Sequence, residues 1–101
     1  MAQVIWTEPA LSDLDAIADY IALDKPDAAR RLVCRVFETA KHLARFPKIG
    51  RRLAEIPNSI YREISVAPCR IFYRYDERKV YIIFIMRAER EFKEIYLEQR
   101  E

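Results

Sequence analysis

Arginine occupies almost every polar position between the short apolar runs of residues 61–91. The stretch reads YREISVAPCRIFYRYDERKVYIIFIMRAERE and contains Arg62, Arg70, Arg74, Arg78, Arg87 and Arg90. An arginine keeps its charge at any physiological pH, and its planar set of N–H donors matches a phosphate or a carboxylate. Three interpretations are open: this region binds an anionic partner, it stabilises negative charge during a reaction, or the arginines only keep it soluble.

The distribution of charge along the chain favours an anionic partner. The net charge is only +2, but residues 1–27 hold six acids and one base, whereas residues 28–75 hold eleven bases and three acids. A basic middle region predicts that the partner is an acidic protein or a nucleic acid. The isoelectric point of about 8.6 argues against a protein that coats DNA.

Other kinds of chemistry have little support in the sequence. His42 is the only histidine, and Cys34 and Cys69 are the only cysteines. Their spacing resembles no metal site, so we expect no metal and no cofactor. No apolar run reaches the roughly 18 residues of a membrane span, and the N-terminus lacks the pattern of a signal peptide. We therefore expect a cytoplasmic chain with free thiols and no contact with a membrane.

The length of the chain predicts one domain spanning residues 1–101. Residues 2–6 are apolar and largely β-branched, which is typical of a strand. Thr7 is the kind of residue that caps a helix, and apolar residues then recur at helical spacing as far as Ile21. A second amphipathic helix is predicted over residues 26–45, so the two helices should form an αα-hairpin.

The second half of the chain predicts a sheet. Strands are expected over residues 60–66, 70–75 and 80–86. Residues 76–78 should form a hairpin loop, Gly50 should occupy a turn with positive φ, and residues 91–99 should form a loosely held helix. The predicted fold class is α+β in the order β-α-α-β-β-β. It has an antiparallel sheet, an N-terminal helical hairpin packed on one face, and a possible short C-terminal helix.

Several motifs, taken in order, resemble the RelE/ParE superfamily of bacterial type II toxins over nearly the whole chain. The motifs are W-T-x-x-A-x-x-D-L (residues 6–14), Y-I (20–21), K-P-D-A-A (25–29), L-A-R-F-P-K-I-G-R (43–51), Y-R-E-I (61–64) and R-I-F-Y-R-Y-D (70–76). The resemblance implies the toxin of a toxin–antitoxin module, of the kind that also serves plasmid stabilization. The long hairpin followed by F-P-K-I-G-R is closer to the ParE-like branch, whose members inhibit DNA gyrase.

The resemblance leaves two alternatives to gyrase inhibition. RelE-like members cut messenger RNA on the ribosome without a metal, so whether the chain is an enzyme stays open. The catalytic residues implied by that branch are Arg70, Arg90 and Tyr96. The connector lysines of the family are not evident here, and arginines, which are poor proton acceptors, would have to replace them. The other alternative is a degenerate member that retains only antitoxin binding.

Both branches imply the same partner, a ParD- or RelB-like antitoxin with an extended arm or an amphipathic helix. It would lie in the groove between hairpin and sheet, and the complex would bind operator DNA through the antitoxin. The residues expected to bind the antitoxin or the target are Arg51, Arg52, Arg62, Arg70, Arg74 and Arg87. A plainer interpretation is also open: strand arginines pair with Glu63, Asp76 or Glu77, Tyr96 anchors the tail, and the arginines of the second helix are only solvated.

Overall fold

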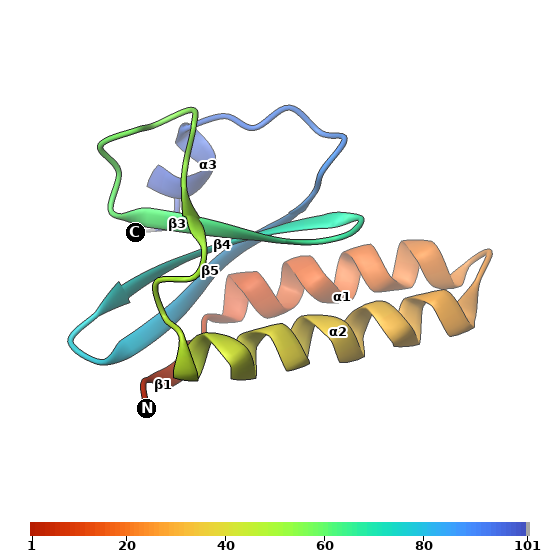
Figure 1. Cartoon of the computed structure of the whole chain (residues 1–101). Coiled ribbons are helices and arrows are strands. Elements are labelled where there is room, and N and C mark those ends of the chain that lie inside the picture. The colour runs from red at the N-terminus through yellow and green to blue at the C-terminus, as the bar shows by residue number, and fades with distance from the viewer. Residues whose placement is uncertain (101) are drawn as a thin grey trace.

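The computed structural model describes residues 1–100, in which a five-stranded sheet packs one of its faces on a helical hairpin (Figure 1). The elements are β1 Gln3–Trp6, α1 Glu8–Ala22, α2 Pro26–Arg45, β2 Arg51–Arg52, β3 Tyr61–Val66, β4 Cys69–Asp76, β5 Lys79–Arg87 and α3 Ile95–Glu98. The α+β class, the element order and the short C-terminal helix are confirmed. Strand β2 was not predicted, because two residues are too few to show any periodicity.

The hairpin forms where the capping residue and the apolar stripes predict it. The Thr7 hydroxyl accepts a hydrogen bond from the Ala10 N–H at 3.4 Å and donates to the carbonyl of Ile82 at 2.7 Å, so it caps α1 and ties it to β5. Both helices bury one face, and α2 contributes Leu32, Val36 and Leu43 to the core. Trp6 packs on Phe37 with 4.8 Å between ring centroids, which joins β1 to α2.

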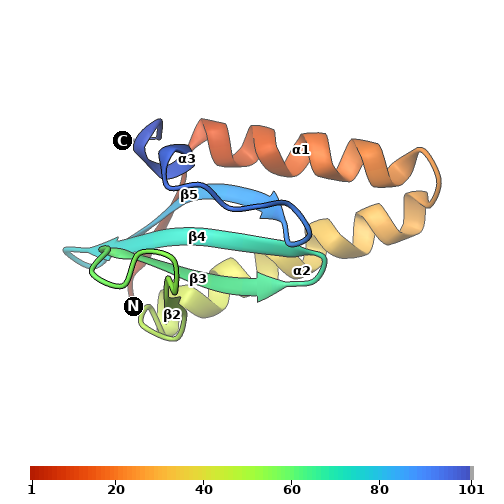
Figure 2. The same cartoon turned by 90° about the horizontal axis from the view of Figure 1, so that it is seen from above.

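The sheet has the strand order β1-β5-β4-β3-β2 (Figure 2). Strands β2 to β5 are antiparallel, but β1 runs parallel to β5, with Val4 opposite Val80, so the sheet is mixed. The expectation of an antiparallel sheet misses this pairing. Parallel neighbours need a long crossover connection, and here the chain between them includes the helical hairpin. The composition of a four-residue strand cannot reveal its direction.

Each face of the sheet has a core of its own. The face against the hairpin buries Ile71, Tyr73 and Ile82. The opposite face buries Phe72 and Phe84, and it is covered by the β2–β3 loop and the C-terminal tail, which lie across the sheet from the hairpin (Figure 1). Residues on this second face are therefore buried, although the alternating pattern of the strands predicts that they face solvent.

Gly50 does not have positive φ, which corrects the expected turn. Its N–H donates to the Tyr73 hydroxyl at 2.8 Å, and that hydroxyl donates to the Pro47 carbonyl at 2.8 Å. A Cβ at Gly50 would lie 2.5 Å from the Tyr73 hydroxyl oxygen, so close packing is the reason for glycine here. Positive φ occurs instead at Glu77 and Arg78, in the tight β4–β5 turn.

The C-terminal tail has stronger anchors than its sequence suggests. Leu97 is only 2% exposed, whereas Ile95 on the same short helix is half exposed. Arg100 forms two hydrogen bonds of 2.9 Å with the Asp13 carboxylate, which also accepts from the Ile85 N–H at 3.0 Å. Because β1 pairs with β5 only as far as Ile82, Asp13 satisfies backbone on the open edge of β5.

Candidate functional site

Glu63 lies at the centre of a cluster of charges on the face away from the hairpin. The side chain is only 2% exposed. Arg51, directly opposite on β2, donates from Nε to Glu63 Oε1 at 2.7 Å. Arg70, on β4, donates from Nε to Glu63 Oε2 at 3.0 Å, and its Nη2 also bonds this oxygen. The register of three strands therefore places a buried carboxylate between two arginines.

Arg70 is held from several sides. Its Nη2 also donates to the Glu55 carboxylate, at 3.0 Å to Oε2, and its side chain is only 14% exposed. The guanidinium lies 4.9 Å from the ring centroid of Phe72 and 5.4 Å from that of Phe92. Burial disfavours the charge of Arg70, but the two carboxylates outweigh burial and raise its pKa. Two arginines and two glutamates thus balance within this cluster.

Glu55 is the more exposed of the two carboxylates in the cluster. Burial alone would raise the pKa of its carboxyl, but its own backbone N–H and the Arg70 guanidinium outweigh burial and lower the pKa below the ordinary value of 4.5. A carboxylate with a lowered pKa stays charged at neutral pH and accepts a proton poorly.

Replacing Glu55 by glutamine is expected to reduce the fall in the free energy of unfolding that the wild type shows as the pH is lowered. Because the pKa of Glu55 is lower in the folded chain than in the unfolded chain, its contribution is present above about pH 4.5 and is lost as the pH falls through the folded pKa. Urea unfolding of both proteins between about pH 7 and pH 3 measures this. Identical profiles for wild type and Glu55→Gln would contradict the assigned ion pair.

Arg90 and Tyr96 lie on the same side of the sheet as Arg70. The Arg90 guanidinium is 5.8 Å from the ring centroid of Tyr96, which packs on Phe84 with a centroid distance of 5.7 Å. Phe92 lies edge-on to Tyr96 at 6.5 Å and also contacts Arg70, so it links the three residues. Within residues 1–100, Arg90 forms no ion pair and is exposed. Among Arg70, Arg90 and Tyr96, Arg90 is therefore the residue whose positive charge is available to an anionic ligand.

Residues suited to other mechanisms lie elsewhere. His42 is exposed on α2 and packs on Phe46 at 5.2 Å between ring centroids, on the hairpin side of the sheet. In the described part of the chain, no group of three or more His, Cys, Asp or Glu side chains is arranged to hold a metal ion. None of the helices in residues 1–100 is long and apolar enough to cross a membrane.

The remaining arginines of the predicted binding surface do not form one patch. Arg52 and Arg62 lie opposite each other in the β2–β3 register. Arg52 donates to the Ser59 carbonyl at 3.2 Å and Arg62 donates to the Gly50 carbonyl at 2.9 Å, so both arginines hold loops. Arg74 lies 3.7 Å from Asp76 and stacks over a tyrosine ring. The plainer interpretation, pairing with neighbouring carboxylates, thus describes the contacts of Arg70 and Arg74.

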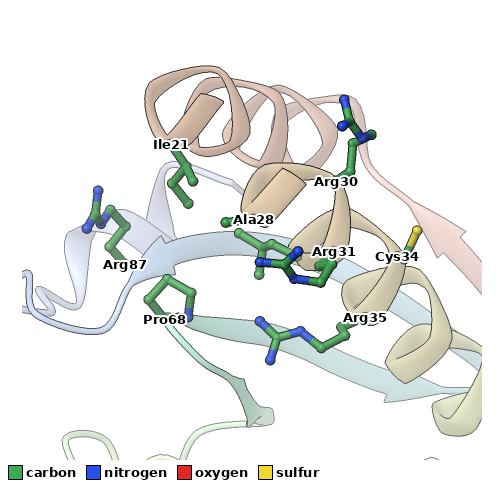
Figure 3. Close-up of a pocket in the computed structure, with 9 residues that line it drawn as sticks. Ile21, Ala28, Arg30, Arg31, Cys34, Arg35, Pro68 and Arg87 are labelled. Carbon is green, nitrogen blue, oxygen red and sulfur yellow. The ribbon is translucent and has the colours of Figure 1, made fainter. Parts of the chain in front are cut away.

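Arg87 lies apart from them, in a groove between the hairpin and the sheet whose α2 arginines were not among the residues expected to bind. The groove, of about 730 Å³, runs between α2, the end of α1 and the β3–β4 turn (Figure 3). Its lining includes four arginines, Arg30, Arg31, Arg35 and Arg87. The signal was present in the spacing of Arg31 and Arg35, which are four residues apart and therefore share a face of α2.

Comparisons with known proteins agree on the kind of molecule. Residues 4–92 match the profile of the family described as the ParE toxin of the type II toxin–antitoxin system parDE. Toxin RelE2 of Caulobacter vibrioides is 40% identical over 91 residues, which are 89% of this chain and 99% of RelE2. The solved chromosomal ParDE toxin–antitoxin system from P. aeruginosa superposes with a TM-score of 0.74 at 26% identity, over 88% of this chain and 98% of that one. The chain belongs to the ParE toxin family of type II toxin–antitoxin systems.

Proposed function

We propose that this toxin acts in the cytoplasm by binding and inhibiting DNA gyrase, and that a cognate antitoxin neutralises it. The observation that carries the proposal is the charge balance around Arg70, whose guanidinium is engaged by Glu63 and Glu55. Cleavage of RNA needs positive charge aimed at the oxygens on which negative charge develops. An arginine already neutralised by two carboxylates supplies little of that charge.

Proton transfer also lacks a suited group beside Arg70. The carboxylates there are Glu63, which is buried between two arginines, and Glu55, whose pKa is lowered. Glu55 is therefore a poor general base at neutral pH, and the Glu63 oxygens are already occupied by hydrogen bonds from Arg51 and Arg70. The arrangement therefore supports binding of a target more than chemistry on it, and likeness to a ParE toxin points the same way.

Two observations support an antitoxin as the partner: the similarity to a known toxin–antitoxin system and the charge of the chain. A solved structure similar to this chain comes from a ParDE toxin–antitoxin system. The basic middle of the chain suits a ParD-like partner with an acidic arm. Binding of the complex to operator DNA is assigned to the antitoxin.

A second function, ribosome-dependent cleavage of messenger RNA, has one observation in its favour. Arg70, Arg90 and Tyr96 lie on one face of the sheet and are linked through Phe92. The likeness to a toxin named RelE2 also favours this alternative. In it, Arg90 would stabilise negative charge and the Tyr96 hydroxyl would exchange a proton.

Arg90→Ala and Tyr96→Phe are each expected to leave growth inhibition unchanged, because neither residue takes part in chemistry under the gyrase proposal. A general acid or base contributes about 10²–10⁴ in rate, so a nuclease would lose that factor. Growth after induction and the positions of messenger RNA ends are measured together. Arg78→Ala, in the exposed β4–β5 turn, is the control.

Two results would contradict the gyrase proposal. Loss of growth inhibition in the folded Tyr96→Phe variant, with loss of new RNA ends, would favour the nuclease. Wild type that does not slow growth would favour a degenerate member that only binds antitoxin.

A further inference from the structure

A hollow of about 300 Å³ lies between the β2–β3 loop and α3. Both segments are on the side of the sheet away from the hairpin (Figure 1). The volume is at the lower end of the range of about 300–1,000 Å³ for small-molecule sites. In the described part of the chain, no lysine and no arginine lines this hollow, although the whole chain has a net charge of +2. The hollow therefore differs in charge from most of the surface around it.

The buried part of the lining is apolar. Leu97 of α3 is 2% exposed, and Ile56 of the loop packs on the same core. Ser59 fixes the loop beside them: its hydroxyl oxygen accepts from the Tyr61 N–H at 3.0 Å, and its own N–H donates to the Ile56 carbonyl at 3.0 Å. Because these contacts lie within the chain, the apolar wall is formed before any ligand binds.

The Tyr61 hydroxyl is a buried polar group without a partner. Tyr61 lines the hollow from β3 and is only 8% exposed, and its hydroxyl makes no hydrogen bond within residues 1–100. Tyr73, the other buried tyrosine, differs in this respect, because its hydroxyl bonds both Gly50 and Pro47. A buried hydroxyl without a partner costs free energy, which a ligand that supplies the partner recovers.

Two carboxylates lie at the exposed rim. Glu94 precedes α3 and Glu98 ends it, and the Glu98 N–H donates to the Glu94 carbonyl at 3.3 Å, so both side chains share one face of the helical turn. Both are exposed, and neither forms an ion pair or a side-chain hydrogen bond within residues 1–100. Like charges at this spacing repel each other, and a cation bound between them would relieve the repulsion.

We propose that this hollow binds an alkylammonium group, carried by a small aliphatic amine or by a lysine side chain of a partner protein. The alkyl chain would lie on Ile56 and Leu97, while the charged head stays at the rim with Glu94 and Glu98. An ammonium has three donors and no acceptor, so it can donate to a carboxylate and to the Tyr61 hydroxyl oxygen together. The site goes beyond gyrase inhibition, because it uses only the β2–β3 loop, β3 and the tail.

Other ligands satisfy this lining less completely. An anion would be repelled by both rim carboxylates. A purely apolar group would cover the wall but leave the Tyr61 hydroxyl without a partner. A guanidinium prefers an open aromatic face for stacking, and the one ring in the described lining, Tyr61, is buried. Arg52 donates to the Ser59 carbonyl at 3.2 Å but is not part of the lining, so the rim carboxylates are open to an added cation.

The test titrates the isotope-labelled full chain with butylamine, which is protonated at neutral pH, and follows the backbone amide signals of Asn58, Tyr61 and Leu97 by NMR. Asn58 also lines the hollow, from the loop. Butanol, of equal chain length but uncharged, and sodium chloride at the same ionic strength are the comparison probes. We expect saturable shifts at these three residues with half-saturation on the order of 1 mM, and binding of butanol at least about tenfold weaker.

The rim variant is Glu94→Gln with Glu98→Gln, which removes both charges and keeps the side-chain size. Its matched control is Asp15→Asn with Asp19→Asn, two exposed carboxylates at the same spacing on α1 and outside the hollow. The rim variant should weaken butylamine binding by at least about tenfold, and the control by less than about twofold.

Tyr61→Phe tests the hydroxyl separately. This variant should weaken butylamine binding by about two- to tenfold. It should leave the midpoint of urea unfolding unchanged or raise it, because the hydroxyl has no partner in the free chain. A lowered midpoint would mean that the hydroxyl is already satisfied, and would contradict its role in binding.

Two further probes, diaminobutane and an acetylated lysine methylamide, distinguish the sources of the ammonium. Tighter binding of the diamine would identify a free amine as the ligand, and equal or tighter binding of the lysine derivative would identify a side chain of a partner. Three results would overturn the proposal: no shift at the hollow with any amine, binding of butanol as tight as that of butylamine, or equal weakening in the rim variant and its control.

Discussion

Arg70→Ala is expected to lower the free energy of unfolding by about 3–5 kcal/mol, as removal of one partner from a buried ion pair does. Glu63, which is 2% exposed, would keep a hydrogen-bonding partner only in Arg51, whose side chain is mostly solvated. Urea unfolding measures the change. Loss of toxicity in this variant would then report unfolding rather than lost catalysis.

Two further variants test whether the cost of Arg70→Ala comes from breaking the buried ion pair or only from losing a large side chain. Arg74→Ala removes a strand arginine whose ion pair, with Asp76 at 3.7 Å, is more exposed, and it should cost about 1 kcal/mol or less. Arg70→Met combined with Glu63→Leu removes both buried charges and should recover much of the loss. A cost for Arg70→Ala no larger than for Arg74→Ala would contradict the buried pair.

Leu97→Ala is expected to cost about 2–5 kcal/mol, the range for truncating a fully buried leucine. Leu97 is the side chain of α3 that inserts into the core shared by Phe72, Phe84 and Met86. The loss should release the tail, so limited proteolysis near the C-terminus should accelerate together with the fall in unfolding free energy.

Ile95→Ala is the matched control, because Ile95 lies on the same short helix and is half exposed. It should change the free energy of unfolding by about 0.5 kcal/mol or less. Equal effects of the two substitutions would mean that α3 is not anchored through Leu97.

The helical hairpin could be predicted because its signals are local. The Thr7 cap, the proline that opens α2 and the apolar stripes each lie within a few residues of the feature they determine. The same holds for the β4–β5 turn at residues 77–78, where two strands meet directly. The features that could not be predicted depend on residues far apart in the chain. They are the direction of β1, the contact between Gly50 and Tyr73, and the pairing of Asp13 with Arg100.

The site was predicted less well for one physical reason. Polar and apolar residues alternate along β3, which suggests that Glu63 faces solvent. The β2–β3 loop and the C-terminal tail cover that face of the sheet, however. The sequence could propose Arg70 as paired or catalytic, because both interpretations need only an arginine on a strand. It could not show that Arg51 and Arg70 meet at one carboxylate, since this depends on the register of β2, β3 and β4.

Supercoiling by DNA gyrase is the measurement that tests the proposed function most directly. Purified chain, with folding checked by circular dichroism, is added to gyrase, relaxed plasmid and ATP. The proposal predicts loss of supercoiling at a modest molar excess of toxin and its recovery when the antitoxin is added. Unchanged supercoiling in the presence of the folded chain would contradict the proposal and shift the function to the ribosome, with Arg70, Arg90 and Tyr96 as the residues of an RNA-cleaving site.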